Sequence, residues 1–194
     1  MRSYRLRTII FLTLCCDLGL FSKRLIAPAA NVITDALHIP GGIGTSFSLM
    51  FLVVAAMLVP RFGCAAVMGT VQSIIALSLG MVGSMGALSP LGYIVPALVI
   101  DLLVGLTQRL RLPRTERAVI INAAAGICAA LTANLIVFRL RGAALVLYLC
   151  IAATSGAICG LAASELVRRL GPVIGRGLRC ENKQGEIEHE EEKK

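Results

Sequence analysis

The stretch AVIINAAAGICAALTANLIVF, residues 118–138, contains no charged residue and is bounded by Arg117 and Arg139. A helix needs about 20 predominantly apolar residues to cross the hydrocarbon core of a bilayer, and this stretch is long enough. Its small and polar residues recur at a spacing of four, which keeps them on one helical face. The stretch therefore predicts a membrane-spanning helix that carries Asn122, Gly126, Ala130 and Asn134 along one side.

The rest of the chain has the same character. Apolar residues make up 57% of the 194 residues, more than the surface of a soluble domain could display. Only three formal charges, Asp35, Arg61 and Asp101, lie between Leu25 and Gln108. Because lipid leaves backbone groups without water as a partner, helices must satisfy them internally. The sequence therefore predicts an all-α, polytopic membrane protein.

Six transmembrane helices can be drawn in a compact bundle, each limited by charge, proline or glycine. They cover residues 8–22, 45–59, 64–82, 93–108, 118–138 and 143–167. Several are shorter than about 20 residues, so a tilted or partly re-entrant second helix stays open. We expect a six-helix transmembrane domain over 1–170 and a charged, disordered cytoplasmic tail over 171–194.

Arginine clusters orient the bundle. With an even number of spans, four basic groups fall on one side of the membrane: Arg2, Arg5 and Arg7; Arg61; Arg109, Arg111, Arg114 and Arg117; and Arg168, Arg169, Arg176 and Arg179. The positive-inside rule then places both termini in the cytoplasm. The opposite side receives Lys23, Arg24, Arg139 and Arg141. Orientation explains the net charge of +8 better than nucleic-acid binding, since aromatic residues are sparse and Trp is absent.

The N-terminal 22 residues also have the pattern of a signal peptide, in which arginines precede an apolar run. Asp17 interrupts that run, and Lys23 and Arg24 precede the alanine-rich residues that could be a cleavage region. We therefore expect a retained first span. Six of the seven cysteines lie inside apolar runs, where we expect them to pack as small apolar side chains.

Small residues at a spacing of four mark the faces on which membrane helices pack. They occur on the third, fourth and sixth spans as Gln72, Ala76 and Gly80; Ala97, Asp101 and Gly105; and Ala152, Gly156, Gly160 and Ser164. The amides and Asp101 should therefore point inward. Gln72 and Asn122 are equally explained as hydrogen-bond bridges between helices, whereas an intramembrane aspartate is a functional candidate by default.

Catalytic motifs are missing from the sequence. There is no HExxH metalloprotease motif, and the two histidines, His38 and His189, form no cluster with metal-ligand spacing, so neither a metal nor a cofactor is expected. No GxxxxGK[ST] motif is present, so the chain is not expected to hydrolyse ATP. Ser155 has no histidine within a span to activate it, which makes an intramembrane protease a remote alternative.

The chain resembles the substrate-binding S component of energy-coupling factor (ECF) vitamin transporters, most of all the YkoE-like subset linked to thiamine or its hydroxymethylpyrimidine precursor. The resemblance covers about residues 5–170. It rests on the segments LIAP (25–28), VIT (32–34), IPGG (39–42), GSMGALS (83–89) and VPALVIDL (95–102). Two departures are the absence of Trp and a first span that offers only Cys15 and Gly19 at the spacing of the family's docking motif.

The resemblance implies a prokaryotic cell-membrane subunit of an ABC-type importer, not an enzyme. It would bind a vitamin-like solute from outside and dock onto a transmembrane T component with two ATPase subunits. We expect a lid formed by the connection 25–44 together with a second loop at 83–90 on the same face, although tight turns explain both loops as well. From facing and depth, the candidate ligand-binding residues are Asn134, Tyr93, Ser84, Gln72 and Asp101, with Asn31 and His38 as lid contacts.

Two alternatives remain, one within transport and one of a different class. A stand-alone secondary carrier or small channel could use Asp17 and Asp101 as a proton relay. A non-transporting membrane scaffold would use the same polar residues only to hold its helices together. A cationic ligand such as thiamine would favour an ionised Asp101, and a neutral pyrimidine would favour the amides.

Overall fold

The computed structural model describes the backbone of residues 6–36, 43–59, 62–80, 86, 88–110 and 112–191. Side chains are described for 9–25, 44–59, 62–80, 86, 88–110 and 112–172. The described part is all-helical and contains no strand. Its elements are α1 (Leu6–Ala36), α2 (Ile43–Leu58), α3 (Cys64–Ser78), α4 (Leu91–Arg109), α5 (Arg114–Ala133), a π-helical turn η2 (Asn134–Phe138) and α6 (Ala143–Glu191).

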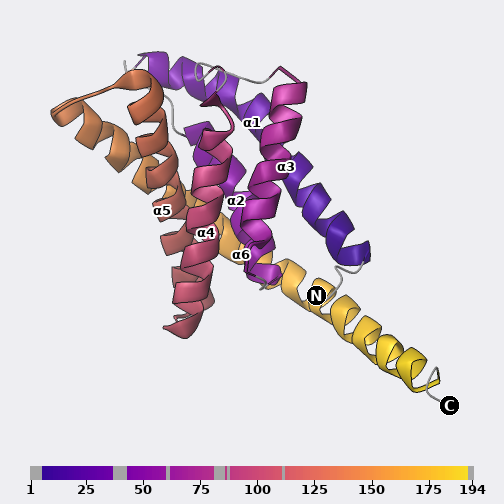
Figure 1. Cartoon of the computed structure of the whole chain (residues 1–194). Helices are drawn as coiled ribbons and strands as arrows, with labels where there is room; N and C mark the ends of the chain where they lie inside the picture. Colours follow the sequence, from indigo (N-terminus) through magenta and orange to yellow (C-terminus); the bar gives the residue numbers. More distant parts are fainter. Residues whose placement is uncertain are drawn as a thin grey trace.

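Successive helices run in alternating directions (Figure 1). The starts of α1, α3 and α5 lie toward the same end of the bundle as the ends of α2, α4 and α6. Among the described residues, three helical segments are long and apolar enough to cross a membrane: Leu91–Arg109, Arg114–Phe138 and Ala143–Pro172. The helices at 44–58 and 64–78 are apolar but shorter.

Helix α2 is the centre of the bundle and contacts each of the other five helices. Every residue from Ser48 to Ala56 is buried, with Leu52, Val53 and Val54 almost fully enclosed. A helix that is apolar all round is typical of a protein core or of a membrane span. The apolar side chains of α2 therefore form the core of the bundle, because the other five helices pack around it.

Two boundaries differ from the sequence prediction. The helix α1 continues through residues 25–36, where a connection between the first two spans was expected. Ala and Leu favour helix, and the first glycine of this region is Gly41. The helix α6 likewise continues to Glu191, although disorder was expected for the tail. Glu and Lys have high helix propensity, and the yellow end of α6 extends beyond the other helices in Figure 1.

Large apolar side chains are exposed on the surface of the bundle, while several polar side chains are buried within its apolar core. Leu14, Leu102 and Ile158 are each more than 60% exposed, whereas Gln72 and Asn122 are at most 2% exposed. In water, such an arrangement would leave apolar surface hydrated and bury polar groups. In lipid it is the favourable one, because only the interior offers partners to polar groups.

Small residues set the closest helix contacts, as their spacing predicts. A Cβ atom added at Gly156 would lie 2.8 Å from the Cα of Ala123, and one at Gly160 would lie 2.6 Å from the Cα of Val119. Both glycines lie on α6 against the backbone of α5. The prediction that this stripe packs against another helix is confirmed.

Candidate functional site

The polar residues that the sequence predicts to face inward are buried. Asn122 is fully enclosed, and Gln72, Asp101 and Asn134 are 2%, 5% and 6% exposed. Their inward orientation is therefore confirmed. What each of them binds within the protein decides whether it is available to a ligand.

Asp101 on α4 caps the start of α3. Its carboxylate accepts hydrogen bonds from the backbone N–H of Ala65 (3.0 Å) and of Ala66 (2.8 Å). The residue that precedes α3, Gly63, has no side chain to do so and adopts a left-handed conformation with φ of 88°. A capping carboxylate satisfies free N–H groups and interacts favourably with the positive end of the helix dipole. Asp101 thus acts as an N-cap supplied by a neighbouring helix.

Gln72 and Tyr93 both meet α1. The Gln72 side chain donates a hydrogen bond to the carbonyl of Cys16 (3.1 Å). It also packs against Gly19, where an added Cβ would lie 2.8 Å from the Gln72 amide nitrogen. The Tyr93 hydroxyl accepts a hydrogen bond from the Lys23 ammonium (3.2 Å), which also lies 4.2 Å from the centroid of the ring. Residues 16–23 of α1 are thus contacted by an amide from α3 and a phenol from α4, and Lys23 of α1 itself supplies a cation.

Asn134 lies elsewhere, at the turn between α5 and α6. Its side-chain oxygen accepts from the N–H of Leu140 (2.7 Å), and its amide nitrogen donates to the carbonyl of the same residue (3.4 Å). The chain turns at Arg139, which has a φ of 49°. Asn134 therefore closes the turn through both backbone groups of Leu140.

The candidate residues do not form one group in the structure. Gln72 and Tyr93 both contact α1. Asp101 instead binds the backbone at the start of α3, and Asn134 binds the backbone of Leu140 in the turn between α5 and α6. Asn31 lies in the helical backbone of α1, in a part whose side chains are not described. His38 and Ser84 lie outside the described residues, as do residues 37–42 of the first proposed lid loop and residues 83–85 and 87 of the second.

A second polar cluster, between α2, α5 and α6, did not emerge from the sequence. The hydroxyls of Ser46 and Ser155 are 3.0 Å apart, and the Asn122 amide nitrogen donates to the carbonyl of Gly156 (2.7 Å). The side-chain oxygen of Asn122 is buried without a hydrogen-bond partner among the described residues. The run of Thr45, Ser46 and Ser48 in an otherwise apolar helix was the available indication of this cluster.

Lys23 is the other residue that sequence analysis missed, because a lysine beside an arginine at the end of a span is normally explained by orientation. Asp17, the second aspartate considered for a relay, lies on the exposed side of α1. Its exposure separates it from the buried carboxylate of Asp101.

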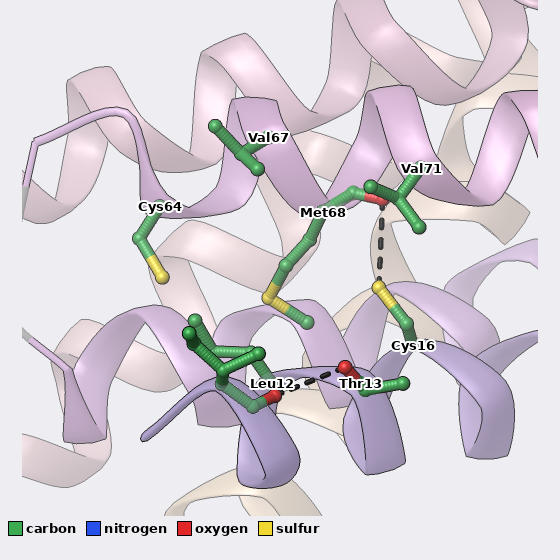
Figure 2. A pocket seen from close by; sticks show the side chains of 8 residues that line it. Leu12, Thr13, Cys16, Cys64, Val67, Met68 and Val71 are labelled. Atoms are coloured by element: carbon green, nitrogen blue, oxygen red, sulfur yellow. Dashed lines mark hydrogen bonds between the residues drawn. The ribbon is translucent and has the colours of Figure 1, made fainter. Parts of the chain in front are cut away.

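An apolar groove of about 180 Å³ lies between α1 and α3. Figure 2 shows the Met68 side chain reaching from α3 toward α1, with Cys16 donating a hydrogen bond from its sulfur to the Met68 carbonyl (3.5 Å). The groove is lined by Ile9, Leu12, Thr13, Cys16, Cys64, Val67, Met68 and Val71. Such a lining suits an acyl chain or an apolar side chain and offers no acid–base chemistry.

Within the described ranges, no group of three His, Cys, Asp or Glu side chains could hold a metal ion. No protein-family model, no curated protein and no solved structure matches this sequence.

Proposed function

We propose that this protein is a six-span membrane subunit that binds a small solute for import, as the S component of an ECF-type transporter does. The observation that carries the proposal is the distribution of side chains. Large apolar side chains are exposed on the outside of the bundle, and amides, hydroxyls and one carboxylate are buried inside it. Alternating helix directions favour an arrangement with both termini in the cytoplasm. The T component and ATPase subunits would then supply the energy.

The ligand site is proposed at the junction of α1, α3 and α4. Tyr93, Lys23 and Gln72 bring an aromatic ring, a cation and an amide to one segment of α1. A flat, hydrogen-bonding heterocycle needs such groups, since aromatic faces stack on rings and a few polar groups fix orientation. Because thiamine and its pyrimidine precursor contain such a heterocycle, they stay the favoured class of substrate.

Within that class, a neutral pyrimidine precursor fits better than thiamine. Lys23 is positively charged and would repel a cationic ligand close to Tyr93. Asp101, the carboxylate that could neutralise a cation, is engaged by the N–H groups of Ala65 and Ala66. Hydroxymethylpyrimidine is therefore expected to bind more tightly than thiamine.

Ligand-dependent thermal stabilisation tests the proposal, because a ligand that binds only the folded protein raises its unfolding temperature. The purified protein would be heated with hydroxymethylpyrimidine, thiamine and a panel of other vitamins. We expect the largest shift with hydroxymethylpyrimidine and a smaller one in Tyr93→Leu. A folded sample that is stabilised by none of these compounds would contradict solute binding.

The scaffold hypothesis is the second candidate, and one observation favours it: Asp101 and Asn134 are both engaged by backbone groups. It predicts no solute-uptake phenotype when the gene is deleted and no copurifying ATPase. Uptake of the solute lost on deletion, together with copurification of an ATPase-bearing complex, would favour the importer. Solute uptake by the chain alone in liposomes with a pH gradient would instead favour the carrier.

A further inference from the structure

A second cavity, of about 680 Å³, opens at the end of the bundle where α4 ends and α5 begins. Its lining combines apolar side chains with two guanidinium groups and an amide. The lining residues are Met57, Leu58, Gln108, Arg114, Arg117, Val167, Gly171 and Pro172. They come from α2, α4, α5 and α6, so four helices build this cavity.

The arginines of this cavity have no acidic partner among the described residues. The Nε of Arg117 is buried and forms no hydrogen bond there. Glu165, an acid of α6, is engaged by Arg168 and Arg169 (both 2.8 Å). A guanidinium nitrogen withdrawn from water without an acceptor costs free energy, which an anion in the cavity would recover.

The two arginines also act on one another. Arg114 and Arg117 are close enough for their positive charges to repel. Both lie in the first turn of α5, whose leading N–H groups lack helical acceptors and carry the positive end of the helix dipole. Charge repulsion and the dipole both favour the binding of an anion at this position.

We propose that this cavity binds a phosphate group, held by the guanidinium groups of Arg114 and Arg117 and by the side-chain amide of Gln108. Arginine forks match the oxygens of phosphate and form charge-assisted hydrogen bonds with them. The apolar side chains of Met57, Leu58 and Val167 would pack against the carbon skeleton attached to that phosphate. The group can come from an anionic phospholipid or from a free phosphate.

The test uses the full-length protein in detergent and measures binding by native mass spectrometry and by thermal shift. One arm titrates phosphatidylglycerol and the other titrates inorganic phosphate. The variants are Arg114→Gln and Arg117→Gln, and the matched control is Arg109→Gln. Arg109 is exposed at the same end of the bundle but does not line the cavity, and its substitution removes the same charge.

We expect saturable binding of one of the two compounds, weakened about tenfold or more in either cavity variant and unchanged in the control. Saturation by phosphatidylglycerol alone identifies a lipid headgroup, and saturation by inorganic phosphate identifies a free phosphate. If Arg117→Gln does not fold, Arg114→Gln at the exposed position and Arg117→Lys carry the test. The proposal is overturned if neither compound saturates, or if the cavity variants bind as tightly as Arg109→Gln.

Discussion

The carboxylate of Asp101 on α4 lies 2.8 Å from the backbone nitrogen of Ala66 in the first turn of α3. With the second bond, to Ala65, the aspartate replaces the capping side chain that Gly63 lacks. An aspartate inside a membrane protein is normally examined as a ligand or proton carrier. Here its contacts give it a structural task, and the two roles predict different phenotypes.

Asp101→Asn should destabilise the protein. The substitution replaces one of two accepting oxygens by an N–H donor that faces a backbone N–H, and a buried unsatisfied donor costs about 1–3 kcal/mol. Unfolding of the purified variant in detergent, compared with wild type, measures the loss. A variant of normal stability that no longer binds solute would show instead that Asp101 serves the ligand.

Gly160→Ala should destabilise the contact between α5 and α6. The new Cβ would lie 2.6 Å from the Cα of Val119, so the helices must separate, and overpacking of this kind costs about 1–3 kcal/mol. Gly105→Ala on α4 is the matched control, because a Cβ there meets nothing within 4 Å. It should leave stability unchanged or raise it by up to about 1 kcal/mol through helix propensity. Equal effects of the two substitutions would contradict the packing at Gly160.

Lys23 and Tyr93 should be energetically coupled. Tyr93→Phe removes the hydroxyl that accepts from Lys23 but keeps the ring, whereas Tyr93→Leu removes both. A double-mutant cycle with Lys23→Met should give a coupling of about 0.5–2 kcal/mol, most of it retained with Phe if the ring dominates. Additive effects of the substitutions would show that the two side chains do not interact.

Asn134→Ala should loosen the turn between α5 and α6. The N–H of Leu140 would lose its acceptor, so its hydrogen exchange should accelerate. Asn134→Asp keeps the oxygen that accepts the 2.7 Å bond and should exchange close to the wild-type rate. Identical exchange at Leu140 in wild type and Asn134→Ala would remove Asn134 from this turn.

Much of the fold follows from charge and spacing. Arg109 and Arg114 flank a short connection, and they mark the end of α4 and the start of α5 to within a few residues of the prediction. Asn122 and Gly156 each belong to a row of small and polar residues spaced by four, one row on each helix. This spacing indicates the buried face of the helix, because lipid offers an amide nothing to bind. Such patterns act within one helix and can be detected without knowledge of its neighbours.

The partners of the polar residues could not be predicted in the same way. Asp101 and Asn134 bind backbone groups, which every residue carries and which leave no trace in the sequence. Lys23 binds Tyr93 across 70 positions of the chain, and its pattern is that of an orientation signal. The continuation of α1 past residue 25 depends on the helix propensity of its residues. It could not be predicted because Pro28 normally marks the end or a kink of a helix.

A six-span bundle requires its short helices to cross the bilayer, and α3 is the shortest of the six. Phe62 and Leu79 flank it and are both exposed, at 86% and 60%. Each would be replaced by cysteine in a variant without native cysteines, and intact cells would be treated with a membrane-impermeant maleimide. We predict labelling of Leu79→Cys from outside and of Phe62→Cys only after the membrane is opened. Labelling of both from the same side would contradict the six-span bundle and, with it, the import function proposed for it.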